Sequence, residues 1–269
     1  MEMKLQGAVL VALLASSASA TTHLAFYNGN GTSSHANGPF FSTLTEAARS
    51  AFGTQGFTLT NMTDKAVASV TRSAFDVVVF PGGSGNGQAE AIGAAGIAAL
   101  RQFVAAGGGY IGTCGGAFLG LQHVLFFGDG PGGRGPPTQE PFDRGHGNVS
   151  VEFSPAGLRD LKLDTARFGG GKNVTILYWQ GPIVKPMDLP TNVSQLGTFR
   201  TEIHSQHTNA TMGEMVNTPA FTSIDGYGAG AAGARNSRGG RVVLNSPHPE
   251  LDPNIPEIYA GELQWVLRM

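Results

Sequence analysis

The chain of 269 residues contains a single cysteine, Cys114, so an intrachain disulfide is excluded and stability depends on the core. Charged residues are also scarce, at 13% of the sequence, well below the usual share of about 25%. The net charge is −2 and no basic run is present, so neither nucleic acid nor an acidic membrane surface is an expected partner.

Long hydrophobic runs are absent too, so no membrane span is expected. The N-terminal residues 1–20 instead have the pattern of a secretory signal peptide. Lys4 supplies a positive charge, residues 8–15 form a short apolar core, and Ala-Ser-Ala at 18–20 is a small-x-small cleavage site. The pattern predicts a mature chain that begins at Thr21 and is located in the secretory-pathway lumen or outside the cell.

Several sites of N-glycosylation are consistent with export. The Asn-x-Ser/Thr sequons are at Asn30, Asn61, Asn148, Asn173, Asn192 and Asn209. Residues 21–269 are expected to form one domain, because a chain of about 250 residues can bury one substantial core.

Glycine is abundant, with 40 residues, and strand-like and helix-like segments alternate through the first half of the chain. Strands are predicted at 23–27, 57–61 and 76–80, and helices at 66–75 and 88–105. A further helix is predicted from about Thr43, because Thr43 and Glu46 have the spacing of a capping box. The run Asp-Val-Val-Val-Phe at 76–80 lacks alternation, which is typical of a strand buried on both faces of a parallel sheet. We therefore expect an α/β fold with a doubly wound, mostly parallel, flavodoxin-like sheet and functional loops at the carboxyl ends of its strands.

The second half of the chain has a different pattern. Shorter, more alternating strands at 149–153, 174–179 and 195–200 indicate a small antiparallel excursion. Residues 128–147 predict a long surface loop, and a glycine-rich stretch at 226–240 leads into a final core strand at 241–244. A helix at 263–267 is expected to close the chain.

The central motif is Gly-Thr-Cys-Gly-Gly at residues 112–116, between a predicted strand and a predicted helix. A nucleophile elbow needs this spacing, because its apex residue is strained and flanking side chains would clash. The thiol of Cys114 would lie at a helix N-terminus, where free N–H groups and the helix dipole favour a thiolate. The alternative is a buried structural cysteine, a common situation for a free thiol.

A cysteine nucleophile needs a base, and the base needs an orienting group. His248 follows the last predicted core strand, so its loop should open on the same edge of the sheet as Cys114. Glu250 lies two residues further, and in an extended segment such residues point the same way. The alternative interpretation is a proline-rich surface turn with a solvated glutamate.

Other candidate sites are weaker. Glu202, His204 and His207 form a small acid–histidine cluster without further clear ligands, so no metal is expected. The glycine-rich stretch at 82–87 lacks the Lys-Ser/Thr ending of a phosphate-binding loop, and no cofactor is expected. Trp179 could line a pocket or pack in the core, and core packing is the favoured interpretation.

The elbow followed far downstream by His-Pro-Glu at 248–250 resembles the class I glutamine amidotransferases, whose triad is Cys, His and Glu. Tyr-Asn-Gly at 27–29, Phe-Pro-Gly-Gly at 80–83 and Tyr-Trp-Gln-Gly-Pro at 178–182 are similar, more specifically, to the amidotransferase-like domain at the N-terminus of fungal biotin–protein ligases. The resemblance covers nearly all of the mature chain. A ligase half is missing, so biotinylation is not expected.

The resemblance implies that Cys114 is the nucleophile, His248 the general base and acid, and Glu250 its orienting group. The N–H groups of Gly115 and Gly83 would form the oxyanion hole. It thus implies an exported hydrolase that acts, through a thioester, on a glutamine-like or γ-glutamyl amide of a small molecule or peptide. Two alternatives stay open: a non-catalytic ligand-binding or vestigial module, and a relative of the ThiJ-like peptidases.

Overall fold

The computed structural model describes residues 21–33, 35–121, 145–168, 170–184, 192–205, 208–211, 215–229, 238–251 and 254–269. The predicted signal peptide and most of the loop predicted at 128–147 lie outside these ranges. Within them, no helix combines the length and the hydropathy needed to cross a membrane.

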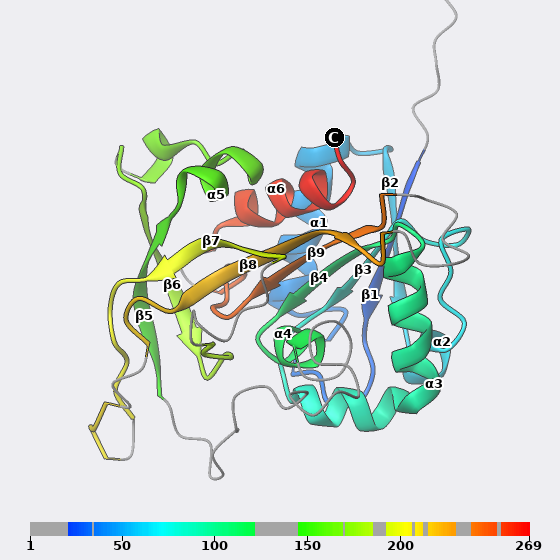
Figure 1. The fold of residues 1–269 in the computed structure, drawn as a ribbon, viewed down its shortest axis with the longest axis horizontal. Coiled ribbons are helices and arrows are strands. Elements are labelled where there is room, and N and C mark those ends of the chain that lie inside the picture. Colours follow the sequence, from blue (N-terminus) through cyan, green and yellow to red (C-terminus); the bar gives the residue numbers. More distant parts are fainter. Residues whose placement is uncertain are drawn as a thin grey trace, which may run out of the picture.

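One nine-stranded sheet, ordered β2-β1-β3-β4-β9-β8-β7-β5-β6, runs through the described molecule (Figure 1). Its strands are β1 (Thr22–Tyr27), β2 (Phe57–Met62), β3 (Val77–Phe80), β4 (Gly109–Thr113), β5 (His146–Phe153), β6 (Asn173–Trp179), β7 (Val193–Phe199), β8 (Pro219–Tyr227) and β9 (Gly240–Asn245). The strands from β2 to β9 in this order are parallel. The remaining pairings, from β9 to β6, are antiparallel. The predicted α/β fold with an antiparallel excursion is confirmed.

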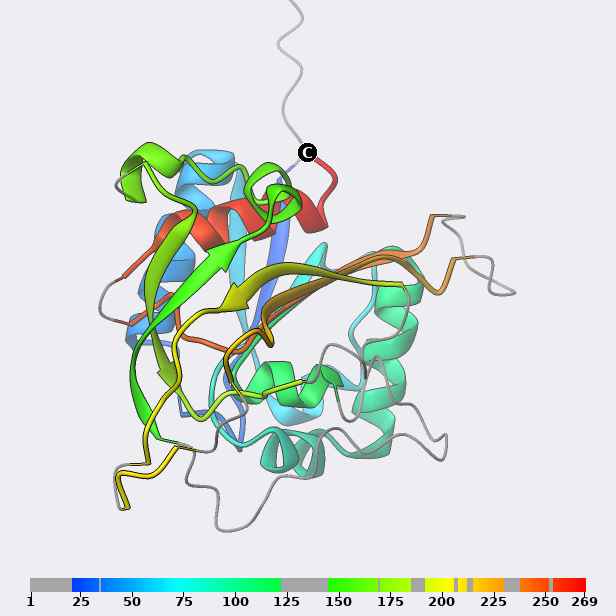
Figure 2. The ribbon, with the colours of Figure 1, turned by 60° about the vertical axis from the view of Figure 1, so that its left-hand side comes forward.

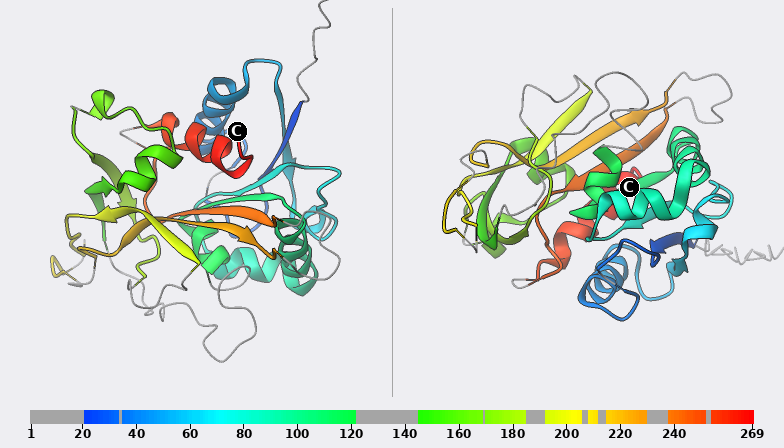
Figure 3. Two further views of the ribbon diagram at one scale, coloured as in Figure 1. Left: turned by 45° about the horizontal axis from the view of Figure 1, so that its top comes forward. Right: turned by 90° about the horizontal axis from the view of Figure 1, so that it is seen from below.

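Helices cover both faces of the sheet (Figures 2 and 3). They are α1 (Pro39–Phe52), α2 (Asp64–Val67), α3 (Gly85–Ala105), α4 (Gly115–Leu119), α5 (Pro155–Asp160) and α6 (Pro256–Val266). One face is covered by α1, α5 and α6, and the other by α2, α3 and α4. The sheet is thereby enclosed on both sides, as a doubly wound fold requires.

The central strand β3 shows why its sequence lacks alternation. Val78 and Phe80 pack into the apolar cluster beneath α3 and α4. Val77 and Val79 pack on the opposite face, in the cluster that α1 and α6 contribute to. All four side chains are fully buried. Both faces of the strand lie in a core, so a polar residue would have no place on either.

Three helices differ from the prediction. Helix α6, expected at 263–267, begins earlier, at Pro256, and ends at Val266. Helix α1 begins at Pro39, because proline at the first helical position has a preset φ and needs no N–H partner. The residue predicted to cap it, Thr43, is buried one turn inside and donates to Oδ1 of Asn254 at 3.2 Å. The helix predicted at 66–75 is wrong, since α2 ends at Val67 and turns follow.

Strand β8 was not predicted from the sequence. Its first six residues, 219–224, are all buried, so this strand lacks the polar–apolar alternation that marked β5, β6 and β7. It pairs with β9 and joins the antiparallel half of the sheet to the parallel half.

Candidate active site

The site lies where two neighbouring parallel strands end. The last residues of β4 and β9, Thr113 and Asn245, are partners in the sheet register. The N–H of Cys114 donates to the Asn245 carbonyl at 2.8 Å, so the chain segments that follow both strands leave the sheet side by side. This register brings the elbow to the loop that carries His248, although they are far apart in the sequence.

Cys114 occupies the apex of a strained elbow. Its backbone has φ 50° and ψ −103°, a conformation that non-glycine residues avoid and that costs about 1–3 kcal/mol. A Cβ on Gly116 would lie 2.0 Å from the Phe80 carbonyl oxygen, and one on Gly112 would lie 2.5 Å from that of Gly116. Both positions need glycine because the turn packs directly against neighbouring backbone.

His248 and Glu250 form a buried pair beside the elbow. Nδ1 of His248 lies 2.7 Å from Oε1 of Glu250, and the two side chains are only 8% and 1% exposed. The backbone N–H of His248 donates to the Leu177 carbonyl at 2.7 Å, and this hydrogen bond ties the loop to β6. Tyr259 of α6 donates to the other oxygen of Glu250 at 2.8 Å. The carboxylate is therefore fixed on both oxygens.

Opposing effects set the protonation of His248. Burial is the largest single effect and lowers its pKa. The charge of Glu250, the nearby Cys114 sulfur and the hydrogen bond to Glu250 act the other way, and together they raise the pKa of His248 well above its ordinary value. The arrangement favours the imidazolium form of His248.

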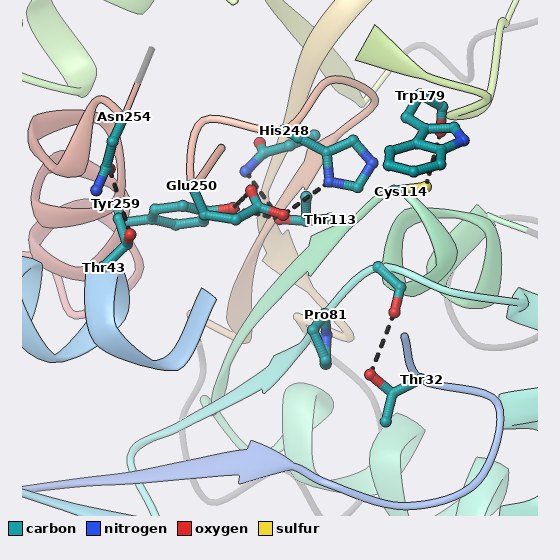
Figure 4. A network of polar contacts seen from close by, with 12 residues as sticks. Thr32, Thr43, Pro81, Thr113, Cys114, Trp179, His248, Glu250, Asn254 and Tyr259 are labelled. Carbon is teal, nitrogen blue, oxygen red and sulfur yellow. Dashed lines mark hydrogen bonds and ion pairs between the residues drawn. The ribbon is translucent and has the colours of Figure 1, made fainter. Parts of the chain in front are cut away.

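The thiol of Cys114 rests close to this imidazole. Figure 4 shows the His248 ring between Glu250 and Cys114, with its second nitrogen directed to the side where Cys114 and Trp179 lie. The Cys114 thiol donates to the Trp179 carbonyl at 3.5 Å, and Nε2 of His248 has no hydrogen-bond partner in the described part of the chain. Catalytic hydrogen bonds often form only once a substrate is bound, so this arrangement is consistent with a Cys114–His248 pair.

The predicted oxyanion residues also meet at the elbow. A Cβ on Gly115 would lie 2.7 Å from the Gly83 nitrogen, so the two backbones are in close contact. Within the described ranges, neither the Gly83 N–H nor the Gly115 N–H donates a backbone hydrogen bond. Gly83 has φ 137°, which favours glycine. Two N–H groups without a backbone partner beside Cys114 are what an oxyanion hole requires.

The loop around Gly83 is hydrogen-bonded to a second loop, which follows β1. The Ser33 N–H donates to the Gly82 carbonyl at 3.0 Å, and the Ser84 N–H donates to the Gly31 carbonyl at 2.8 Å. This second loop is fixed by an aspartate that sequence reasoning missed, Asp64. Its carboxylate accepts from the Tyr27 hydroxyl at 2.6 Å and from the Asn30 N–H at 2.9 Å. No local motif marks Asp64, because its partners lie in a different segment.

The acid–histidine cluster is not part of the site. Glu202 accepts from the Met215 N–H at 3.0 Å, and Nδ1 of His204 lies 3.2 Å from the Asn209 carbonyl oxygen. His207 lies outside the described residues. Among those that are described, no group of three or more potential metal ligands occurs.

The position of Trp179 differs from the one expected. Its side chain is 54% exposed, so the favoured interpretation, core packing, is wrong. The indole contacts the His146 ring at 4.9 Å between centroids and lies beside Cys114 (Figure 4). Trp179 therefore borders the site with both its carbonyl and its ring.

Comparisons with known proteins agree with this architecture. Residues 22–132 match the family model described as biotin-protein ligase, N terminal. No curated protein sequence matches the chain. Among solved structures, a ThuA-like protein from Bacteroides uniformis is similar at a TM-score of 0.50 and 14% identity, over 91% of each chain. A glutamine amidotransferase is similar at a TM-score of 0.48 and 14% identity, over 89% of this chain and 98% of that one.

The family match ends before His248 and Glu250, so their assignment rests on the geometry described above. At 14% identity the structural likeness shows the fold alone. The resemblance expected from the sequence is thus confirmed for residues 22–132, which match the N-terminal family of biotin–protein ligases, and the chain has an α/β fold similar to that of a ThuA-like protein.

Proposed function

We propose that the protein is a cysteine hydrolase that cleaves a glutamine-like or γ-glutamyl amide. The observation that carries this proposal is the strained apex at Cys114 beside the buried His248–Glu250 pair. A structural cysteine gains nothing from a strained backbone, and a solvated surface turn would not bury a histidine and a glutamate together. The amide class of substrate is taken from the family resemblance.

The first half of the reaction forms a thioester. The Cys114 thiolate attacks the amide carbonyl carbon, and the carbonyl electron pair moves to oxygen, where the Gly83 and Gly115 N–H groups stabilise it. The C–N bond then breaks as the His248 imidazolium donates its Nε2 proton to the leaving amine. Glu250 stabilises the imidazolium and fixes its orientation through Nδ1.

The second half releases the acid. Nε2 of neutral His248 accepts a proton from water as the water oxygen attacks the thioester carbonyl. The C–S bond breaks, and the Cys114 thiolate and the imidazolium are restored. No further residue is needed for the proton balance, because His248 gives one proton and takes one back.

Turnover assays test this proposal. Purified protein should release ammonia from glutamine or an amine from γ-glutamyl amides, and Cys114→Ala should abolish release. Gly171→Ala is the matched control, because its added Cβ would be exposed and have its nearest neighbour at 3.8 Å. No turnover, together with ligand binding that Cys114→Ala leaves unchanged, would instead favour the non-catalytic binding module.

We also propose that the protein is exported and N-glycosylated. All six sequon asparagines are exposed in the structure. Asn30 is the least available of them, because its Nδ2 already donates to Asp64 at 2.8 Å. Expression in a eukaryotic secretory host should give a secreted protein whose mass falls on enzymatic deglycosylation. Retention in the cell, or an unchanged mass, would contradict this proposal.

A further inference from the structure

A buried chain of polar side chains extends from the triad into the interface of β4, β9 and α6. Tyr259 donates to Oε2 of Glu250, and its hydroxyl lies 2.9 Å from Oγ1 of Thr113. The amide of Asn245 in turn donates to Oγ1 of Thr113 at 3.5 Å. Beside Asn245 lies Glu262 of α6, which is fully buried.

The direction of each hydrogen bond follows from Glu250. A carboxylate only accepts, so Tyr259 must give it the hydroxyl proton. The Tyr259 oxygen is then the acceptor for the Thr113 hydroxyl, whose oxygen accepts from the Asn245 amide nitrogen. Every donor therefore points towards Glu250, and the Oδ1 atom of Asn245 is left as an acceptor at the far end.

This far end lacks a donor. Oδ1 of Asn245 and both carboxyl oxygens of Glu262 are buried and have no hydrogen-bond partner in the described part of the chain. Buried acceptors are unfavourable unless a donor is supplied. A proton on Glu262 supplies it, because a neutral carboxyl carries one O–H donor and keeps an acceptor oxygen.

The surroundings of Glu262 also favour the neutral form. Burial raises the pKa of Glu262 well above the ordinary value, the polar contact with the Asn245 side chain lowers it, and the charge of Glu250 raises it further. Tyr259 on the same helix is a neutral phenol, whose own pKa is raised by burial and by the two glutamates. Thr113 is uncharged, and α1 packs on α6 through apolar side chains. Two arginines reach α6 elsewhere: Arg241 donates to the Trp265 carbonyl at 2.7 Å, and Arg167 pairs with Glu257. The charge that shifts the pKa of Glu262 is that of Glu250.

We propose that Glu262 is a positioning residue of the triad, which holds a proton and donates it in a hydrogen bond to Oδ1 of Asn245. The chain then runs in one direction from Glu262 to Glu250 and holds the Tyr259 hydroxyl on the carboxylate. Glu250 is thereby kept as the acceptor for Nδ1 of His248. The positioning role rests on the proposed hydrolase function, whereas the bound proton does not.

Alkylation of Cys114 over a range of pH tests the positioning role. Glu262→Met removes the donor and should lower the alkylation rate about tenfold near neutral pH, the effect of one lost hydrogen bond to a charged network. Glu262→Gln, which is neutral and can donate, should restore the rate. Glu46→Gln, an exposed glutamate on α1, is the control. If Glu262→Met does not fold, Tyr259→Phe breaks the same chain at its other end and should lower the rate likewise.

Infrared spectroscopy tests the proton without any reaction at Cys114. The wild type should show the carbonyl band of a buried carboxylic acid, and Glu262→Gln should lose it. The unfolded chain releases this proton above pH of about 4.3, whereas the folded chain keeps it. As the pH rises above that value, the wild type should therefore lose stability relative to Glu262→Gln. Its unfolding constant should grow about tenfold for each unit of pH.

The outcomes separate the two claims. Wild-type alkylation in both Glu262→Met and Tyr259→Phe would overturn the positioning role. A carboxylic acid band that persists in Glu262→Gln, or a stability difference that does not change with pH, would overturn the bound proton. An unreactive Cys114 in the wild type would contradict the hydrolase function and, with it, the positioning role.

Discussion

The protonation of His248 is a balance between burial and its two partners, Glu250 and Cys114. Glu250→Gln removes one negative charge but keeps the shape of the side chain. Burial should then prevail, and the pKa of His248 should fall. An NMR titration of the His248 imidazole in the wild type and the variant measures this shift directly. An unchanged titration would show that Glu250 does not control the proton.

The same substitution has a pH-dependent effect on stability. A raised pKa of His248 means that protonation stabilises the fold, fully below about pH 6.5 and less as the pH rises through the raised value. Glu250→Gln should therefore destabilise the protein most in mildly acidic solution, by about 3 kcal/mol, the cost of breaking a buried pair. Denaturant unfolding at several pH values checks this trend, and a loss that grows towards alkaline pH would contradict it.

Single residues differ in how far the sequence reveals them. Cys114, His248 and Glu250 could be named in advance because each sits in a short motif after a recognisable core strand. Tyr259 and Glu262 could not, because their role comes from the way α6 packs on β4 and β9. A buried polar chain between separate elements leaves no local pattern in the sequence.

At the scale of elements, the loop after β3 is placed against both Cys114 and His248. A Cβ on Gly82 would lie 2.9 Å from Cε1 of His248 and 3.6 Å from Cβ of Cys114. Gly82→Ala should therefore displace the imidazole and lower turnover by up to about a hundredfold, as a misplacement near 1 Å can. Gly171→Ala, which meets nothing closer than 3.8 Å, should leave turnover unchanged. Equal turnover in the two variants would contradict the observed placement of the loop.

The elements themselves were predictable where one physical signal dominates. β3 was recognised because four consecutive buried side chains leave no polar position. The start of α1 was missed because Thr43 and Glu46 imitate a helix cap, whereas Pro39 begins the helix. β8 was missed because its residues are buried by α3 and by the antiparallel half together, a tertiary effect.

At the scale of the whole molecule, α6 joins the two halves of the core. Ile258 packs into the cluster of the antiparallel strands. Tyr259 and Leu263 pack into the cluster between α1 and the parallel strands. Pairing of β8 with β9 makes the sheet continuous across the same boundary (Figure 1).

Because sheet and helix both cross this boundary, we expect one cooperative unfolding transition, as for a single domain. Calorimetry should give equal calorimetric and van't Hoff enthalpies. Two separable transitions would show that the parallel and antiparallel halves fold independently.

The central claim is that Cys114 and His248 form an activated pair, and the rate of Cys114 alkylation against pH tests it most directly. The account predicts that alkylation of the wild type persists well below pH of about 8.5, where a free thiol ionises, and that His248→Ala abolishes this reactivity. An ordinary thiol profile that is the same in both proteins would contradict the account and leave a binding protein on an amidotransferase-like fold.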